Sequence, residues 1–343
     1  MATDKADSSP QQQGPAQRVE RGGRVRRIGL SLFHSREASI AIAGIVLVAY
    51  FQSTARAFLS PSNIANLAEY AATTAIIAVG EVMVLISGEV DLSVGQVYAL
   101  SPFLMYYAHK AGVPFVPAIV LGLIPAAIIG IVNGVITVVL EIPSFITTLG
   151  TLFLINGLTL TVSGGYPVAP KSGPVVANIF GGNAISQSLW AIGVMLILQF
   201  VLVKTRWGMH TIATGGNLIG AAEVGVKTGF IKIGNFIICS VLGGLAGTLD
   251  CFRIGSIDPL AGGTEIMFMA IASAVIGGTL LTGGSGTIIG AFLGAGVLGI
   301  LKDGFTLSGV SAYTFDMILG GAILITMLIN VHLSRLRAAG GGR

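Results

Sequence analysis

Residues 116–140 read VPAIVLGLIPAAIIGIVNGVITVVL and contain no charged side chain. A helix of about 20 apolar residues crosses the roughly 30 Å hydrocarbon core of a bilayer, so this stretch is typical of a transmembrane helix. The whole chain of 343 residues has the same character: 53% of its residues are apolar, 10% are charged and the mean hydropathy is +0.86. A soluble domain carries about 25% charged residues. The composition therefore predicts a membrane protein.

Similar apolar runs follow one another between residues 38 and 333. They predict an all-α membrane protein, a polytopic bundle of about ten transmembrane helices. The third, sixth and eighth runs are short, so these spans are the most easily broken or miscounted. The predicted spans are residues 39–58, 63–87, 93–109, 116–140, 144–163, 187–203, 231–252, 265–280, 286–302 and 311–332.

Lysine and arginine residues in the loops predict the orientation, because cytoplasmic loops carry an excess of them. With ten spans, both chain ends share a side with residues 204–232. That side holds seven basic residues in the amino-terminal tail, four in the loop and three at the carboxyl end, whereas the other side holds five in all. We therefore expect both termini in the cytoplasm, although an eight-span arrangement passes a weaker version of this test.

Polar segments flank the transmembrane domain, which we assign to residues 38–333. Residues 1–37 are rich in glutamine and then arginine, which predicts a disordered basic cytoplasmic tail, and residues 334–343 form a second cytoplasmic tail. The net charge of +4 follows from this topology and does not indicate nucleic-acid binding. The four histidines flank spans, and Cys239 and Cys251 read as small apolar filler in one span. We therefore expect no metal site, cofactor or disulfide.

Two glycine-rich interruptions divide the apolar runs, one in each half of the chain. The first is ISGEVDLSVG at 86–95, and the second is IGGTLLTGGSG at 276–286. Paired interruptions point to two pseudo-repeated halves around a central pathway, because non-helical backbone at membrane depth is tolerated only against protein or water. The sequence thus predicts helix breaks at Gly95, Gly283 and Gly284, although a chance likeness of glycine-rich segments is the alternative.

Three carboxylates, Glu81, Glu89 and Asp91, surround the first interruption. A carboxylate inside a bilayer is costly and is by default a functional candidate. Asp91, expected at the cytoplasmic interface, either caps the next helix through the amides of Ser93 and Gly95 or takes part in the pathway. Glu81 lies about two turns deeper, and it either lines the pathway or makes a structural hydrogen bond.

A second polar group lies toward the opposite side of the membrane. It forms either a docking edge for an external partner or a solvated rim. Its members are Asp250, Asp258, Glu265 and Asp316, together with Arg253.

The hydrophilic loop at residues 204–232 is built largely from small residues. We expect a short helix across the membrane face, with Gly215 and Gly216 turning into it, and with small side chains that let it sit in the groove of another protein. The alternative is an amphipathic helix in the membrane interface. No phosphate-binding G-x-x-x-x-G-K-[ST] motif occurs in the sequence, so any ATP-driven motor must be a partner.

Taken together, several segments resemble ribose-type ABC sugar transporter permeases, in the same order and from about residue 60 to 330. They are GEVDLSVG at 88–95, IPSFITTLG at 142–150, TRWG at 205–208 followed by ATGGN at 213–217, GSIDPLAG at 255–262, and IGGT at 276–279 followed by GGSGTIIG at 283–290.

This resemblance implies a permease subunit of an importer in the bacterial inner membrane, and not an enzyme. The implied partners are ATPase subunits, a second permease copy, and a periplasmic or lipid-anchored binding protein that delivers a monosaccharide or related polyol. The resemblance also implies that the loop after the sixth span couples to the ATPase. The coupling residues carried over are Gly215, Gly216, Asn217, Ala221 and Gly225.

The chain departs from the family pattern at two places. Ala222 stands where the family often has an arginine, so the usual charged pairing with the ATPase is in doubt, and Glu223 could supply a different one. Glu89 replaces a glycine of the first motif. From their positions, Phe145 and Asn156 are the expected polar and aromatic groups of the pathway.

Three other interpretations remain open. The same architecture could carry branched-chain amino acids, nucleosides or a signalling furanose. A secondary transporter would use Glu81 to couple transport to protons or sodium. An intramembrane protease would use Ser285 in its G-x-S-G turn, but the only downstream histidine, His332, ends the last span, and a nucleophile and its base must come within hydrogen-bond reach.

Overall fold

The computed structural model describes residues 36–311 and scattered positions between 314 and 328. The described part is helical, apart from one isolated β-bridge between Val168 and Ile257. Most of the expected tails at 1–37 and 334–343, most of the tenth expected span at 311–332, and Asp316 lie outside the described residues. The helices are α2 (Arg36–Thr54), α3 (Pro61–Ile86), α4 (Val94–Lys110), α5 (Phe115–Val139), α6 (Ser144–Ser163), α7 (Pro174–Ile179), α8 (Ala184–Lys204), α9 (Arg206–Gly216), α10 (Leu218–Glu223), α11 (Thr228–Ile254), α12 (Gly263–Ile276) and α13 (Ile288–Leu307).

Seven of the described helices are long and apolar enough to cross a membrane: α2, α3, α5, α6, α8, α11 and α13. The prediction of an all-α, multi-pass membrane protein is therefore confirmed. The prediction that the sixth span is short was wrong, because the corresponding helix, α8, has 21 residues. The helices α4 and α12 have 17 and 14 residues. A total of about ten spans, and the repetition of the two halves, remain predictions.

Each of the two short helices adjoins a partly buried non-helical segment. At about 1.5 Å per residue, α4 is about 25 Å long and α12 about 21 Å, less than a bilayer core. Residues 87–93 lead into α4, and residues 277–287 follow α12. Residues 91–93, which lead directly into α4, are buried, so this part of the non-helical backbone lies against protein, as non-helical backbone at membrane depth must.

The helix α3 is the centre of the molecule. Every residue from Ala72 to Ile86 is buried, and α3 packs against α8, α11, α12 and α13. By contrast, α5 buries mainly small residues that face α4 and α11. A Cβ atom at Gly130 would lie 2.6 Å from the Ile237 Cα, so the glycine allows close backbone packing of the kind that holds helices together in lipid.

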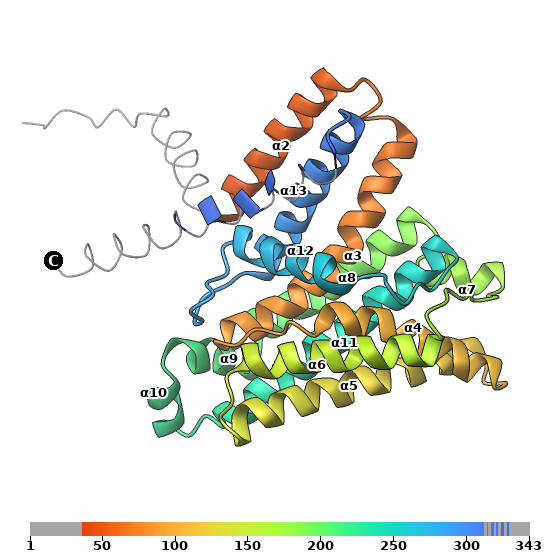
Figure 1. Ribbon diagram of the computed structural model, residues 1–343. Coiled ribbons are helices and arrows are strands. Elements are labelled where there is room, and N and C mark those ends of the chain that lie inside the picture. The colour runs from red at the N-terminus through yellow and green to blue at the C-terminus, as the bar shows by residue number, and fades with distance from the viewer. Residues whose placement is uncertain are drawn as a thin grey trace, which may run out of the picture.

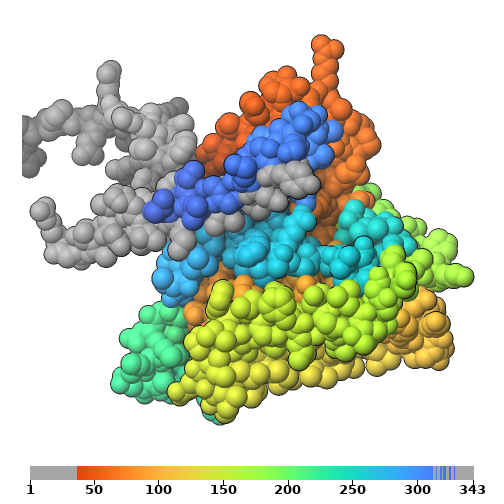
Figure 2. All heavy atoms as spheres, in the orientation of Figure 1, coloured from red at the N-terminus to blue at the C-terminus, as the bar shows by residue number. Residues whose placement is uncertain are grey.

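The helix ends gather at two opposite ends of the molecule. Figure 1 shows α9 and α10 at one end of the layer formed by α5 and α6, and α7 at the other. We call them the α10 end and the α7 end. Figure 2 shows α10 projecting from the body at one corner. All basic residues of the 204–232 loop lie at the α10 end, whereas Lys110 and Arg253 lie with the helix ends near α7.

Candidate functional site

The 204–232 loop forms two helices, α9 and α10, instead of the single short helix expected. Gly215 and Gly216 belong to the last turn of α9, so the turn into α10 occurs one residue later, at Asn217. The Asn217 N–H donates to the Ala213 carbonyl and closes α9, and its side-chain Oδ1 accepts from the Gly220 N–H at 2.9 Å and caps α10. Asparagine is one of the best N-cap residues, and this one fixes the angle between the helices.

The far end of α10 closes in a left-handed turn. Gly225 has φ +87°, its N–H donates to the Ala222 carbonyl at 2.9 Å, and the Val226 N–H donates to the Ala221 carbonyl at 3.0 Å. This is the Schellman arrangement, in which a glycine satisfies the last carbonyls of a helix. Asn217 and Gly225 therefore define α10 as a separate short unit, with Ala221 buried beneath it.

Two apolar side chains of this unit escaped the sequence analysis, which weighed only its small residues. Ile219 is 73% exposed and Val224 is 80% exposed, on either side of Ala222 and Glu223. Exposed apolar side chains on a projecting helix are typical anchors for a partner groove. The signal was present in the sequence as isolated apolar residues within the polar loop.

The helix α9 is fixed to α11. The indole Nε1–H of Trp207 donates to the Asn235 Oδ1 at 2.9 Å, and the Asn235 amide donates to the Thr211 hydroxyl at 3.3 Å. A Cβ atom at Gly234 would lie 2.2 Å from the Trp207 ring, so this glycine leaves room for the indole against α11. The helix α9, which leads into α10, is therefore held on α11 by a packed and hydrogen-bonded contact.

Three glycine-rich segments meet below α3, and we call this contact the glycine junction: residues 86–88, 215–216 and 283–284. The Gly284 N–H donates to the Ile86 carbonyl at 2.8 Å. A Cβ atom at Gly215 would lie 1.7 Å from the same carbonyl oxygen, and Gly284 has φ +76°, a conformation that L side chains rarely adopt. The junction thus brings the predicted coupling residues Gly215 and Gly216 together with the second predicted helix break.

The first helix break is held by buried polar side chains. One carboxylate oxygen of Asp91 accepts from the Ser93 N–H at 2.9 Å and from its hydroxyl at 2.6 Å, and the other accepts from the Ser240 hydroxyl at 3.3 Å. The Asn133 amide donates to the Ser93 hydroxyl at 2.8 Å. Asp91 is fully buried and is bonded to Ser240 near the middle of α11, because residues 87–93 turn back into the bundle.

The Gly95 N–H does not donate to Asp91. Gly95 instead packs against the start of α12. A Cβ atom at Gly95 would lie 2.0 Å from the Gly263 carbonyl oxygen, so this glycine lets the start of α4 touch the start of α12. The helix break therefore rests on α12 as well as on α5 and α11.

Glu89, which departs from the family motif, makes an ion pair. Its carboxylate lies 2.5 Å from the Lys232 ammonium, and both side chains are less than one-fifth exposed. This pair joins the first helix break to the first turns of α11, at the last residue of the 204–232 loop. Sequence reasoning missed Lys232, because nothing in the local pattern places two residues 143 positions apart side by side.

Glu81 is fully buried one turn above the junction on α3. Among the described residues neither of its carboxyl oxygens has a well-formed hydrogen bond, although the Cys239 thiol and the Asp91 backbone face it. Cys239 therefore contacts a carboxyl group and is not only apolar filler.

Phe145 and Asn156 do not reach this group of residues. Both lie on α6, where Phe145 is 57% exposed among other outward-facing apolar side chains and Asn156 is half-buried. The structure therefore places neither beside Glu81, Asp91 or the glycine junction.

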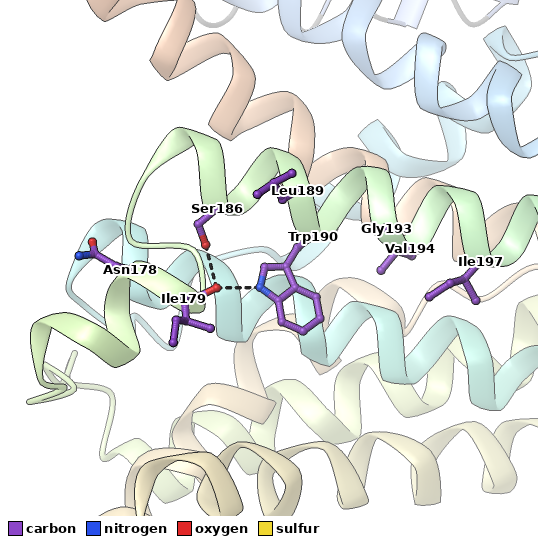
Figure 3. Close-up of a pocket in the computed structure, with 8 residues that line it drawn as sticks. All are labelled: Asn178, Ile179, Ser186, Leu189, Trp190, Gly193, Val194 and Ile197. Atoms are coloured by element: carbon purple, nitrogen blue, oxygen red, sulfur yellow. Dashed lines mark hydrogen bonds between the residues drawn. The ribbon is translucent and has the colours of Figure 1, made fainter.

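A cavity of about 350 Å³ opens on the outside of α7 and α8, far from these residues. Figure 3 shows that the Trp190 indole and the Ser186 hydroxyl both donate to the Ile179 carbonyl, at 2.9 and 2.8 Å. The remaining lining is largely apolar, including Leu189 and Ile197. These bonds hold α7 on α8, and the cavity contains no residue expected to act in a pathway.

The sequence profile described as branched-chain amino acid transport system / permease component matches residues 63–328. The xylose/arabinose import permease protein XylH of Sulfolobus acidocaldarius is 37% identical over 89% of this chain and 88% of its own length. The ribose import permease protein RbsC of Escherichia coli K12 is 33% identical over 86% and 93%. The D-allose transport system permease protein AlsC of the same strain is 32% identical over 89% and 94%.

No solved structure matches the fold. The sequence matches nevertheless cover most of the chain, including both helix breaks and α10. The protein therefore belongs to the family of branched-chain amino acid transport system permease components.

Proposed function

We propose that this chain is the membrane-spanning subunit of an ATP-driven ABC importer, and that it forms the path for a monosaccharide or a related polyol. The observation that carries the proposal is the glycine junction, where the end of α9, which leads through Asn217 into α10, contacts both helix breaks. Relatives named as import permeases for xylose and arabinose, for ribose and for allose support the substrate class.

The proposed mechanism involves alternating access and no covalent chemistry. ATP hydrolysis takes place on a separate partner, which docks on α10 through Ile219 and Val224, with Glu223 beside them. Closure of two ATPase subunits would move α10, and the rigid contacts of α9 would pass the motion to α11 and to the glycine junction. Because the helix breaks are joined there, both would move together.

The proposed assembly contains two permease copies and an external binding protein that delivers the solute. In this arrangement α10 and both chain termini face the cytoplasm, and the α7 end faces the binding protein across a bacterial plasma membrane. The basic residues of the 204–232 loop support this orientation. The described helices also leave broad apolar faces on α5 and α6, which suit lipid or the second copy.

The test is solute-stimulated ATPase activity in nanodiscs that hold this chain together with its genomically neighbouring ATPase and binding protein. We expect one member of a panel of pentoses, hexoses and polyols to stimulate hydrolysis. Ile219→Asp should abolish stimulation, because it places a charge in an apolar contact. Leu140→Asp, a matched change at a 62%-exposed residue of the same end, should not. Failure of any ATPase to co-purify would refute the proposal.

Another solute is the nearest alternative, since the family description mentions branched-chain amino acids and one relative is named an autoinducer 2 import system permease protein. Leucine and nucleosides therefore belong in the same panel. Stimulation by one of these alone would keep the importer class and replace the substrate.

A further inference from the structure

A polar cavity of about 220 Å³ lies among helix ends on the side of the membrane opposite α10. It is bounded by the first halves of α3 and α4, the end of α11, the start of α12 and the second half of α13. The residues that carry its chemistry are Tyr70, Thr73, Tyr98, Asp250, Arg253 and Lys302. Three charged residues that line the cavity, Asp250, Arg253 and Glu265, belong to the polar group that was expected to form either a docking edge or a solvated rim.

Asp250 is the centre of one wall and is 5% exposed. Its carboxylate accepts hydrogen bonds from the Tyr98 hydroxyl, from the Arg253 Nε at 2.5 Å and from the Thr73 hydroxyl at 3.4 Å. Thr73 and Tyr98 are themselves almost completely buried. A solvated rim would leave such side chains exposed, so the burial indicates a built site.

Lys302 forms the other wall. Its ammonium donates to the Tyr70 hydroxyl at 2.8 Å and to the Glu265 carboxylate, and it lies 4.5 Å from the centre of the Tyr70 ring. Arg253 also approaches Glu69 at 4.0 Å. Both cations of the cavity are thus paired with carboxylates, and a charged ligand would have to break an existing pair.

A neutral ligand rich in hydroxyl groups fits this arrangement best. Hydroxyl groups both donate and accept, and hydrogen bonds to ionised partners are about twice as strong as neutral ones. The tyrosine rings add apolar surface for the C–H face of such a ligand. The volume is below the roughly 300–1,000 Å³ of pockets for drug-sized ligands, as a single small ring requires.

We propose that this cavity is a binding subsite for one monosaccharide on the permease itself, where the solute pauses after leaving the binding protein. The inference rests on the proposed function and adds to it that this chain, and not only the binding protein, selects its substrate. Tyr98 is the selecting residue, since its hydroxyl reaches from α4 to Asp250 on α11 and ties the helix after the first break to the cavity.

The experiment uses the complete transporter in proteoliposomes and compares uptake of D-xylose, D-ribose and D-allose with uptake of their monodeoxy analogues. Tyr98→Phe removes one hydroxyl and keeps the ring, and Thr73→Val removes a second hydroxyl independently. The matched control is Tyr107→Phe on the same helix, where the hydroxyl donates to the Val162 carbonyl outside the cavity.

We expect wild type to prefer the transported sugar over one of its deoxy analogues, and Tyr98→Phe to reduce this preference by about tenfold, the value of one hydrogen bond to a charged network. Tyr107→Phe should keep the wild-type preference. An unchanged preference in both Tyr98→Phe and Thr73→Val overturns the subsite and leaves the importer intact. Absence of ATP-dependent uptake of every sugar by wild type would instead overturn the proposed function.

Discussion

The glycine junction makes a sharp prediction for two adjacent residues of α9. Gly215 and Gly216 both have helical backbone, so alanine is locally compatible at each. A Cβ atom at position 215 would lie 1.7 Å from the Ile86 oxygen and 2.7 Å from the Gly284 nitrogen, and contacts below 3.0 Å are essentially never seen for a Cβ atom. At position 216 the nearest atom would be the Gly284 Cα, at an ordinary 3.8 Å.

The expected magnitude follows from these distances. Gly215→Ala must separate two backbones, which costs about 1–3 kcal/mol of overpacking, and it disrupts the hydrogen bond from Gly284 to Ile86, worth about 0.5–1.5 kcal/mol. A loss of about 2–4 kcal/mol corresponds to a fall in Tm of about 3–6 °C for a chain of 343 residues. Gly216→Ala should be neutral or stabilise by up to about 1 kcal/mol, because alanine favours a helix more than glycine does.

The assay is thermal unfolding of both variants in detergent, followed by solute-stimulated ATPase activity of the assembled transporter. We expect Gly215→Ala to lose both stability and stimulation, and Gly216→Ala to keep both. Equal behaviour of the two variants would refute the junction. Normal stimulation by a destabilised Gly215→Ala variant would show that the junction holds the fold but does not transmit motion.

Three further predictions test other contacts. Breaking the ion pair by Lys232→Met should lower the free energy of unfolding by about 2–4 kcal/mol, because it leaves Glu89 mostly buried without its partner. Adding Glu89→Gln should recover part of this loss, which a double-mutant cycle measured by thermal unfolding would show. Simple additivity of the two changes would contradict the pairing. Asn217→Ala should raise amide hydrogen exchange across 218–223 through loss of a cap worth about 1 kcal/mol, whereas Asn217→Ser should not; equal protection in both would mean that packing alone orders α10. Glu81→Gln keeps the side-chain shape and removes its ability to ionise. ATP-driven uptake should persist in this variant, because the proposed mechanism does not use protonation of Glu81. If uptake by wild type collapses with an uncoupler and is lost in the variant, the protein is a coupled secondary carrier instead.

The position of the helices was largely predictable from the sequence. Apolar runs of membrane-spanning length have one stable conformation in lipid, because no water satisfies the backbone there. The first nine predicted spans each coincide with a described helix, and the ends of α6 match the prediction to the residue. The least accurate end was that of the ninth span, predicted at residue 302, because α13 continues five residues further, to Leu307.

The candidate site was predictable only in part. Glycines 215, 216, 283 and 284 could be identified as special from the motifs, but as two separate features. Their contact depends on how α3, α9 and the segment after α12 approach one another, and residues nearly 200 positions apart leave no local periodicity in the sequence. The same reason hid the Glu89–Lys232 pair.

The sequence by itself determined that this chain is a helical membrane protein, where its helices break, and which family it resembles, because bilayer burial and glycine punctuation are local properties. Only the tertiary structure decided the burial of Asp91, the exposure of Ile219 and Val224, and the gathering of Tyr98, Asp250 and Lys302 around one cavity. Those depend on the return of residues 87–93 into the bundle and on the packing of five helix ends, and both are set by contacts between distant segments.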